Sequence, residues 1–294
     1  MATSLHDILR RVRRLELRAR GKVREQLAGE YHTSFKGQGI DFADHRVYLA
    51  GDDVRAIDWN VTARMPEPYI RTFVEERELT VYLLVDISPS LEWGSGRLTK
   101  RELATEVAAT LAFSALRNND KTGLILFSRD VELVVPAARG RAHVLRLLRE
   151  ILYREAGPGL TRPAVALDAL RRAVPKRCLA FLISDMAGEG FEASLKPVGR
   201  RHDLIAVSLH DPSDRALPPV GLVCLQDPET GESVLADTDD APLGQQLSHD
   251  WQAWRDGIDQ VFRACGCDHL AVSTDADYLP ALHALLRRRS RHPR

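Results

Sequence analysis

Three oxygen-bearing side chains, Asp86, Ser88 and Ser90, follow the short apolar run 81–85 at intervals of two residues. In extended backbone this spacing places the three side chains on the same side. Carboxylate and hydroxyl oxygens are the ligands that hard divalent cations prefer, with Mg²⁺ first and Mn²⁺ or Ca²⁺ as alternatives. The pattern therefore predicts one part of a divalent-cation site.

Two further segments end in groups of the same kind. Thr161 closes the glycine-rich loop 157–161, which runs into an expected helix, and Asp185 closely follows the apolar residues 182–183. If the apolar runs are parallel strands, the loops that follow them meet at the edge of the sheet where Asp86 lies. We expect Thr161 and Asp185 to join the first three residues there. The alternative is that all five are solvated turn residues that cap helices.

From residue 79 onward, apolar runs alternate with segments whose apolar residues recur every three or four positions. Strands that are apolar throughout are typical of parallel sheets covered by helices on both faces. The alternation predicts an α/β fold over residues 79–294, with a doubly wound, mostly parallel sheet. Strands are expected over 79–85, 122–127, 131–135, 178–184, 204–209 and 269–272, and helices over 99–117, 142–153, 163–174, 245–264 and 276–288.

Three other segments complete the chain. Residues 1–29 combine apolar residues at helical spacing with a surplus of arginine, which predicts an amphipathic helix that ends at Gly29, packed on its own domain or docking a partner. Residues 30–78 are rich in Gly, Asp, Arg and aromatic residues and predict a small β-rich element held by Asp–Arg pairs. The alternatives are a partner surface, a second metal site or a catalytic acid pair. The turn residues 227–231 predict a hairpin over 222–236, which we expect to pack with this element.

The overall composition argues against several classes of protein. The 294 residues hold 41 Lys+Arg and 41 Asp+Glu, so no net charge draws the chain to nucleic acid. A nucleic-acid binder would depend on the arginine-rich ends, and the acidic stretch 225–250 counts against it. The apolar runs are far shorter than the roughly 20 residues of a membrane helix, and four cysteines do not form a disulfide framework. We expect a cytoplasmic protein with no membrane span and no nucleic-acid partner.

The combination of Asp86, Ser88, Ser90, Thr161 and Asp185 resembles the metal-ion-dependent adhesion site of von Willebrand factor A domains. The resemblance implies that the three hydroxyls bind Mg²⁺, while the two carboxylates act largely through bound waters. Because few carboxylates touch the ion, it stays electrophilic, and an Asp or Glu of a protein partner can take an open position. The resemblance thus implies protein recognition with no catalytic residue.

Several stretches of unusual composition carry a second resemblance, which covers most of the chain. They are 35–42 (Phe-Lys-Gly-Gln-Gly-Ile-Asp-Phe), 46–48, 51–59 (Gly-Asp-Asp-Val-Arg-Ala-Ile-Asp-Trp), 62–64, 75–77, 227–231 and 274–278. In these stretches the sequence is similar to the bacterial family catalogued as domain of unknown function number fifty-eight. Many members carry membrane helices ahead of this region, of which this sequence shows no sign. The family resembles companions of chaperone-like MoxR-type AAA+ ATPases, which implies an adaptor or co-chaperone partner of such an ATPase.

A metal-dependent phosphoesterase or other hydrolase at the same site is the alternative function. It would need a base beside the metal. His210 and Asp211, which follow the expected strand 204–209, are the best candidates, and His45 is a weaker one. The sequence contains no Gly-x-Ser-x-Gly elbow and no Gly-x-x-x-x-Gly-Lys-Ser/Thr loop, so the chain is not itself the ATPase.

Overall fold

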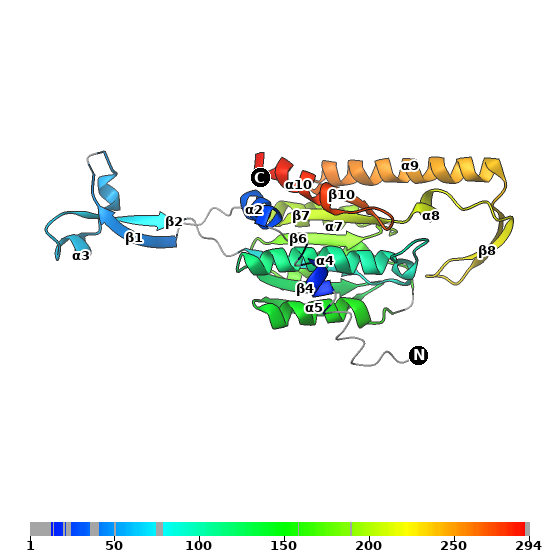
Figure 1. Cartoon of the computed structure of the whole chain (residues 1–294), viewed down its shortest axis with the longest axis horizontal. Helices are drawn as coiled ribbons and strands as arrows, with labels where there is room; N and C mark the ends of the chain where they lie inside the picture. Colours follow the sequence, from blue (N-terminus) through cyan, green and yellow to red (C-terminus); the bar gives the residue numbers. More distant parts are fainter. Residues whose placement is uncertain are drawn as a thin grey trace. The chain divides into compact units, whose positions relative to one another are not determined.

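The computed structural model describes residues 15–19, 25–35, 41–49, 51–74, 79–157, 159–188 and 190–291, together with Arg13 and Gly21. The chain forms two compact units, Phe35–Leu79 and the combination of Met1–Ser34 with Thr80–Arg294. Each unit is described here by itself (Figure 1). The packing of residues 30–78 with the hairpin 222–236 therefore stays a prediction.

The larger unit is built on a six-stranded sheet with the strand order β10-β7-β6-β3-β4-β5 (Figure 1). Only β5 in this sheet runs antiparallel to its neighbour, and the other pairs are parallel. The apolar runs form the central strands because helices bury them on both faces. This confirms the predicted α/β fold with a mostly parallel sheet. The strands are β3 (Thr80–Asp86), β4 (Lys121–Phe127), β5 (Val131–Ala138), β6 (Leu179–Ser184), β7 (Asp203–His210) and β10 (Asp268–Ser273).

Helices cover the sheet on both faces, as the doubly wound prediction requires. Tyr82 and Leu84 belong to a core cluster that also contains residues of α6, α7 and α9, among them Phe262. On the other face α4 contacts β3, β4 and β7, and α5 packs on α4. The helices are α4 (Lys100–Arg117), α5 (Arg141–Tyr153), α6 (Pro163–Ala173), α7 (Glu192–Arg201), α9 (Ala241–Ala264) and α10 (Leu279–Arg291), with the short η2 (Pro89–Glu92) and α8 (Pro212–Arg215).

Local sequence determines where two of these helices begin. Thr99 and Glu102 form a reciprocal capping box, which starts α4 at Lys100 and places that lysine in its first turn. Pro163 occupies the first turn of α6, where its missing N–H leaves no donor unsatisfied. Both helix starts matter for function because they follow loops at the carboxyl edge of the sheet.

The N-terminal segment differs from expectation. Helix α2 (Glu25–Ser34) continues through Gly29, so the predicted helix end there is wrong. Tertiary contacts with α10 outweigh the weak helix propensity of glycine, since the Ser34 hydroxyl donates to Leu286 O (2.6 Å) and Tyr31 is buried. Residues 1–12, 14, 20 and 22–24 of the predicted helix lie outside the described residues.

In the smaller unit β1 (Asp41–Val47) pairs antiparallel with β2 (Tyr69–Val74), and η1 (Val54–Ala56) and α3 (Trp59–Thr62) lie between them in the chain. Arg46 Nη2 lies 2.7 Å from Asp52 Oδ1, which is an Asp–Arg pair of the expected kind. Asp58 instead caps α3 and lies 3.0 Å from His45 Nε2. His45, the weaker candidate base of a hydrolase, therefore contacts the Asp58 carboxylate that caps α3.

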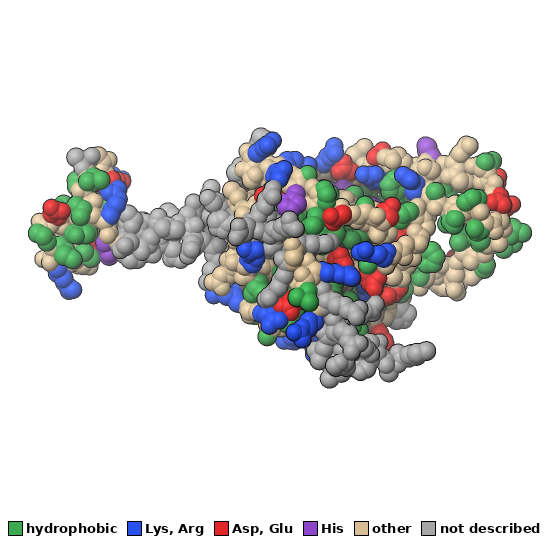
Figure 2. All heavy atoms as spheres, viewed as in Figure 1, with side chains coloured by type: hydrophobic (Ala, Val, Ile, Leu, Met, Phe, Trp, Pro, Cys, Tyr) green, Lys and Arg blue, Asp and Glu red, His purple; other side chains and the backbone are tan. Residues whose placement is uncertain are grey.

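Basic and acidic side chains lie interspersed on the face of the larger unit that Figure 2 shows. This distribution matches the balanced composition of the chain. Within the described ranges, no helix combines the length and the apolar character that a membrane crossing requires.

Candidate functional site

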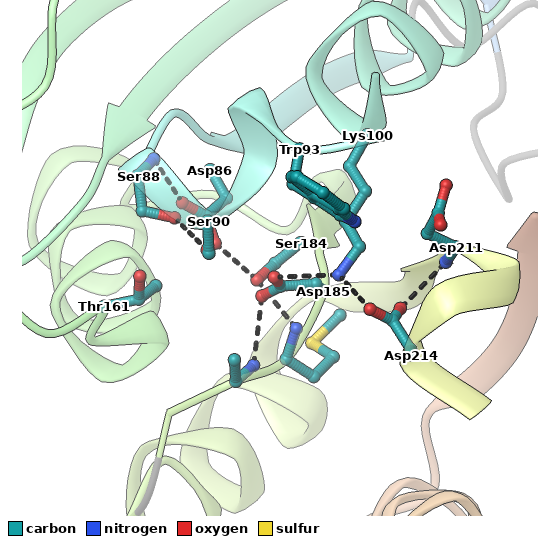
Figure 3. A network of polar contacts seen from close by, with 12 residues as sticks. Asp86, Ser88, Ser90, Trp93, Lys100, Thr161, Ser184, Asp185, Asp211 and Asp214 are labelled. Carbon is teal, nitrogen blue, oxygen red and sulfur yellow. Dashed lines mark hydrogen bonds and ion pairs between the residues drawn. The ribbon is translucent and has the colours of Figure 1, made fainter. Parts of the chain in front are cut away.

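The candidate site lies at the carboxyl ends of β3 and β6. β3 has β4 on one side and β6 on the other, so the winding of the sheet changes direction between β3 and β6. Open α/β sheets form ligand sites at such switch points. The register pairs Val85 with Ile183, which brings Asp86 and Ser184, the last residues of the two strands, to the same edge. Figure 3 shows Asp86, Ser184 and Asp185 gathered there.

Asp86 is completely buried, and both of its oxygens accept hydrogen bonds. The Ser88 backbone N–H donates to Oδ1 (2.8 Å), and the Ser184 hydroxyl donates to Oδ2 (2.6 Å). Burial, followed by the nearby Asp185 carboxylate, raises the pKa of Asp86 to about 7. Burial thus favours the protonated form of Asp86, whereas a positive charge nearby would favour the ionised form.

Asp185 is also buried, and burial raises the pKa of its carboxyl group. The ammonium group of Lys100, the Ala187 amide and the Ser90 hydroxyl counteract this rise because they favour the ionised form. Lys100 Nζ lies 3.6 Å from Asp185 Oδ2 and 3.0 Å from Asp214 Oδ1. One lysine thus supplies positive charge to a carboxylate of the site (Figure 3).

Ser88 and Ser90 place two hydroxyls beside the carboxylates. Their Oγ atoms lie 3.0 Å apart, and Ser88 is completely buried. The segment turns into η2 at Pro89, so Ser88 and Ser90 do not continue the extended strand assumed from the sequence. The short helix nevertheless keeps both hydroxyls on the side of Asp86 (Figure 3).

Thr161 reaches the same edge from the loop before α6. It is buried, its backbone N–H donates to Glu229 Oε2 (2.7 Å), and its hydroxyl donates to Glu229 Oε1. Gly188 fixes the distance of this loop from the loop after β6, because a Cβ at Gly188 would lie 2.6 Å from Thr161 O and 2.5 Å from Pro163 Cδ. Only glycine allows so close an approach without a shift of the backbone.

The structure thus brings all five predicted residues to one edge, whereas their role as metal ligands stays a prediction. It adds three residues that sequence reasoning missed: Ser184, Lys100 and Glu229. Ser184 carried a signal, as a polar residue that ends a buried strand directly before Asp185. Lys100 and Glu229 carried none, because only the tertiary fold brings them to the site.

The donor set can accept a hard cation only if the hydroxyls take part. Among the described residues, no three carboxylate, imidazole or thiol groups converge into a set that could hold a metal ion. The site instead offers the hydroxyls of Ser88, Ser90 and Thr161 with two buried carboxylates, all of them oxygen donors suited to Mg²⁺. The residues therefore fit a cation that neutral hydroxyls bind directly, with few charged groups in contact with it.

His210 and Asp211, the candidate bases of a hydrolase, are held by structural contacts. The His210 ring lies edge-on to Trp251 and Trp254, and burial lowers its pKa to about 4. Asp211 caps α8. Burial would raise the pKa of Asp211, but hydrogen bonds from Ser213, Ser95 and Thr274 outweigh it and keep that pKa well below its usual range.

Several solved structures are similar to parts of this chain at low sequence identity. An aerotolerance-related membrane protein from Bacteroides fragilis, with multiple mutations to serines, is 15% identical with a TM-score of 0.47 and covers 72% of this chain and 98% of its own. The VWA domain of SpRpn10 is 12% identical with a TM-score of 0.41 and covers 70% and 94%. The expectation of a cytoplasmic protein is contradicted by the first of these neighbours, which is named as a membrane protein.

Sequence relatives extend over half of the chain or more. An uncharacterized protein of Mycobacterium tuberculosis is 36% identical over 271 residues, which are 91% of this chain and 85% of the relative. An uncharacterized protein of Mycobacterium avium is 35% identical over 160 residues, which are 53% and 94%. The family described as "Protein of unknown function DUF58" matches residues 44–254. The chain therefore belongs to the DUF58 family.

Proposed function

We propose that the chain is a protein-interaction module that uses a divalent cation, Mg²⁺ above all, to capture an acidic side chain of a partner. The observation that carries this proposal is the pair Asp86 and Asp185, two buried carboxylates at adjacent strand ends with the Ser88 and Ser90 hydroxyls beside them. Two like charges in a buried site favour a bound cation, because the cation offsets their repulsion.

The hydroxyls of Ser88, Ser90 and Thr161 would hold the ion, and Asp86 and Asp185 would hold waters bound to it. When bound, the ion supplies an electrophilic centre for a carboxylate. The chain contributes the orientation of these groups through the Ser88 amide and the Ser184 hydroxyl, which fix both oxygens of Asp86. Without the ion, Lys100 supplies the positive charge beside Asp185.

Exposed apolar side chains near the site support a recognition surface. Leu160, directly before Thr161, is 60% exposed, and Trp93, which follows the Ser90 segment, is 56% exposed. Trp93 lies beside the Lys100 side chain in Figure 3. Aromatic and apolar residues around a polar centre are typical of interaction sites.

A MoxR-type AAA+ ATPase is the partner we propose, with the chain acting as its adaptor or co-chaperone. The resemblance of the family to companions of such ATPases supports this choice. The VWA-like fold, a general scaffold for protein interactions, supports only the broader proposal of a protein partner. An acidic residue on the surface of the ATPase would complete the shell of the cation.

Calorimetric titration with Mg²⁺ and capture of a purified MoxR-type ATPase test the proposal together. Wild type should bind one Mg²⁺ and capture the ATPase, and a chelator should abolish capture. Asp86→Ala and Asp185→Ala should lose both properties with unchanged circular dichroism, while Asp256→Ala, on the exposed face of α9, should keep them. Intact capture by Asp86→Ala would refute the metal bridge, and Mg²⁺-dependent hydrolysis of a phosphate ester, lost in that variant, would favour an enzyme.

A further inference from the structure

The hairpin formed by β8 (Leu222–Gln226) and β9 (Ser233–Asp237) presents an acidic side chain on an ordered turn. Asp227 organises this turn, since its Oδ1 accepts from the Glu229 N–H and its Oδ2 accepts from the Thr230 hydroxyl, both at 2.8 Å. Gly231 completes the turn with a φ of 77°, which glycine adopts without strain. Glu229 is thus held at the tip of the hairpin by local contacts.

The Glu229 carboxylate enters the candidate site. Its Oε2 accepts from the Thr161 backbone N–H at 2.7 Å, and its Oε1 accepts from the Thr161 hydroxyl. Thr161, a predicted metal ligand, therefore donates a hydrogen bond to each oxygen of the Glu229 carboxylate. An acid from another segment of the chain thus already occupies a place beside the site.

The rest of the hairpin is lightly attached to its own unit. Most of its strand residues are exposed, including Leu222 (69%) and Leu235 (70%), and a regular two-stranded ladder joins them to each other. Figure 2 shows hydrophobic and acidic side chains on the surface over this hairpin. Elements with few buried contacts open at low free energy, so the hairpin can leave the site without unfolding the sheet.

We propose that Glu229 is an internal ligand of the cation site, which takes the place of the partner's acidic side chain until that partner displaces it. This inference rests on the proposed function, because it assigns the regulation and the partner chemistry of the same site. The partner would offer a carboxylate on a tight turn, as residues 227–231 do.

The covalent link to the site makes the internal ligand an effective competitor. A tethered group acts at an effective concentration on the order of millimolar, so a free acidic segment of equal intrinsic affinity must exceed that concentration. A physiological partner must therefore add contacts beyond the carboxylate. The exposed Leu160 and Trp93 are available for such contacts.

The test compares the full chain as wild type, Glu229→Gln and the matched control Glu232→Gln, which removes an exposed acid of the same hairpin. Titration with Mg²⁺ alone measures the affinity of each form for the cation. Hydrogen exchange over residues 222–237, with and without Mg²⁺, measures docking of the hairpin. A synthetic peptide with the sequence of residues 226–232 measures access of a free acid to the site.

We expect Glu229→Gln to bind Mg²⁺ about tenfold more weakly than the other two forms, as loss of one charged contact implies. Mg²⁺ should protect the hairpin amides in wild type and Glu232→Gln only. The peptide should bind only to Glu229→Gln, and only with Mg²⁺. Equal Mg²⁺ affinity and equal hairpin protection in all three forms would overturn the inference alone. If wild type gives no more heat with Mg²⁺ than Asp86→Ala, the inference and the proposed function fail together.

Discussion

The Ser184 hydroxyl donates to Asp86 Oδ2 at 2.6 Å and so joins the carboxyl ends of two neighbouring strands. Both residues are completely buried. The Ser184 oxygen in turn accepts from the Met186 N–H at 3.0 Å, and Met186 adopts a left-handed conformation with a φ of 59°. The hydrogen bond therefore couples the orientation of the central carboxylate to the loop that carries Asp185.

Replacing Ser184 by alanine should weaken the site without removing a predicted ligand. At pH 8, where Asp86 is ionised, loss of this hydrogen bond to a charged group lowers the free energy of unfolding by about 1.5–3 kcal/mol. It should also raise the pKa of Asp86 further, because the hydroxyl favours the ionised form. The pH midpoint of Mg²⁺ binding should therefore rise. Ser114→Ala, which removes a buried hydroxyl bonded to Thr110 O within α4, is the control and should leave that midpoint in place.

Asp86 should make the stability of the cation-free chain fall as the pH rises. Its folded-state pKa of about 7 exceeds the unfolded value of about 3.9, so between these values the native state holds a proton that the unfolded state releases. The free energy of unfolding contributed by this group therefore decreases from about pH 4 to about pH 7 and is constant above. Asp86→Asn replaces the carboxyl group by an amide that does not titrate, so this dependence of stability on pH should disappear.

Urea denaturation in chelator from pH 4 to pH 8 measures this effect. The variant should gain stability relative to wild type as the pH rises, and a constant difference across the range would contradict the buried ionisation. Mg²⁺ should stabilise wild type more at pH 8 than at pH 5, because it binds the deprotonated site.

Lys100 should compete with the cation for the carboxylates. Its Nζ lies 3.6 Å from Asp185 Oδ2 and its side chain is nearly buried. Lys100→Met leaves Asp185 without this counter-charge, which should destabilise the chain in chelator by about 3 kcal/mol. Removal of a positive charge beside the site should also tighten Mg²⁺ binding severalfold at low salt.

Calorimetry and urea denaturation at low and high salt check both effects of the Lys100 substitution. Lys196→Met, on an exposed position of α7, is the control for loss of one positive charge. Weaker Mg²⁺ binding by Lys100→Met would show that the lysine positions the site instead of competing for it.

Gly188 should determine the position of Thr161. A Cβ at Gly188 meets the backbone oxygen of Thr161 and the ring of Pro163, so the two loops must separate in Gly188→Ala. Mg²⁺ affinity should fall about tenfold, on the order of one lost ligand contact, although every donor is still present. Gly96→Ala, where a Cβ meets open space, should bind Mg²⁺ as wild type does. Equal affinities in the two variants would show that the spacing of these loops is unimportant.

Much of the fold could be predicted because its signals are local. The apolar runs that became β3 and β6 are buried on both faces, and burial on both faces leaves no alternation in the sequence. The start of α4 was readable from Thr99 and Glu102, which satisfy each other's backbone donors. The end of the N-terminal helix could not be predicted from local sequence, because contacts with α10 stabilise α2 beyond Gly29.

The candidate site divides in the same way. Asp86, Ser88, Ser90 and Asp185 could be placed from the sequence alone, since polar residues that directly follow buried strands collect at one edge of a parallel sheet. Lys100 and Glu229 could be placed only by the tertiary structure. Lys100 reaches the site from the first turn of a helix, and Glu229 meets Thr161 from a turn 68 residues away along the chain. Such contacts depend on how whole elements pack, and the order of residues within one element carries no record of that packing.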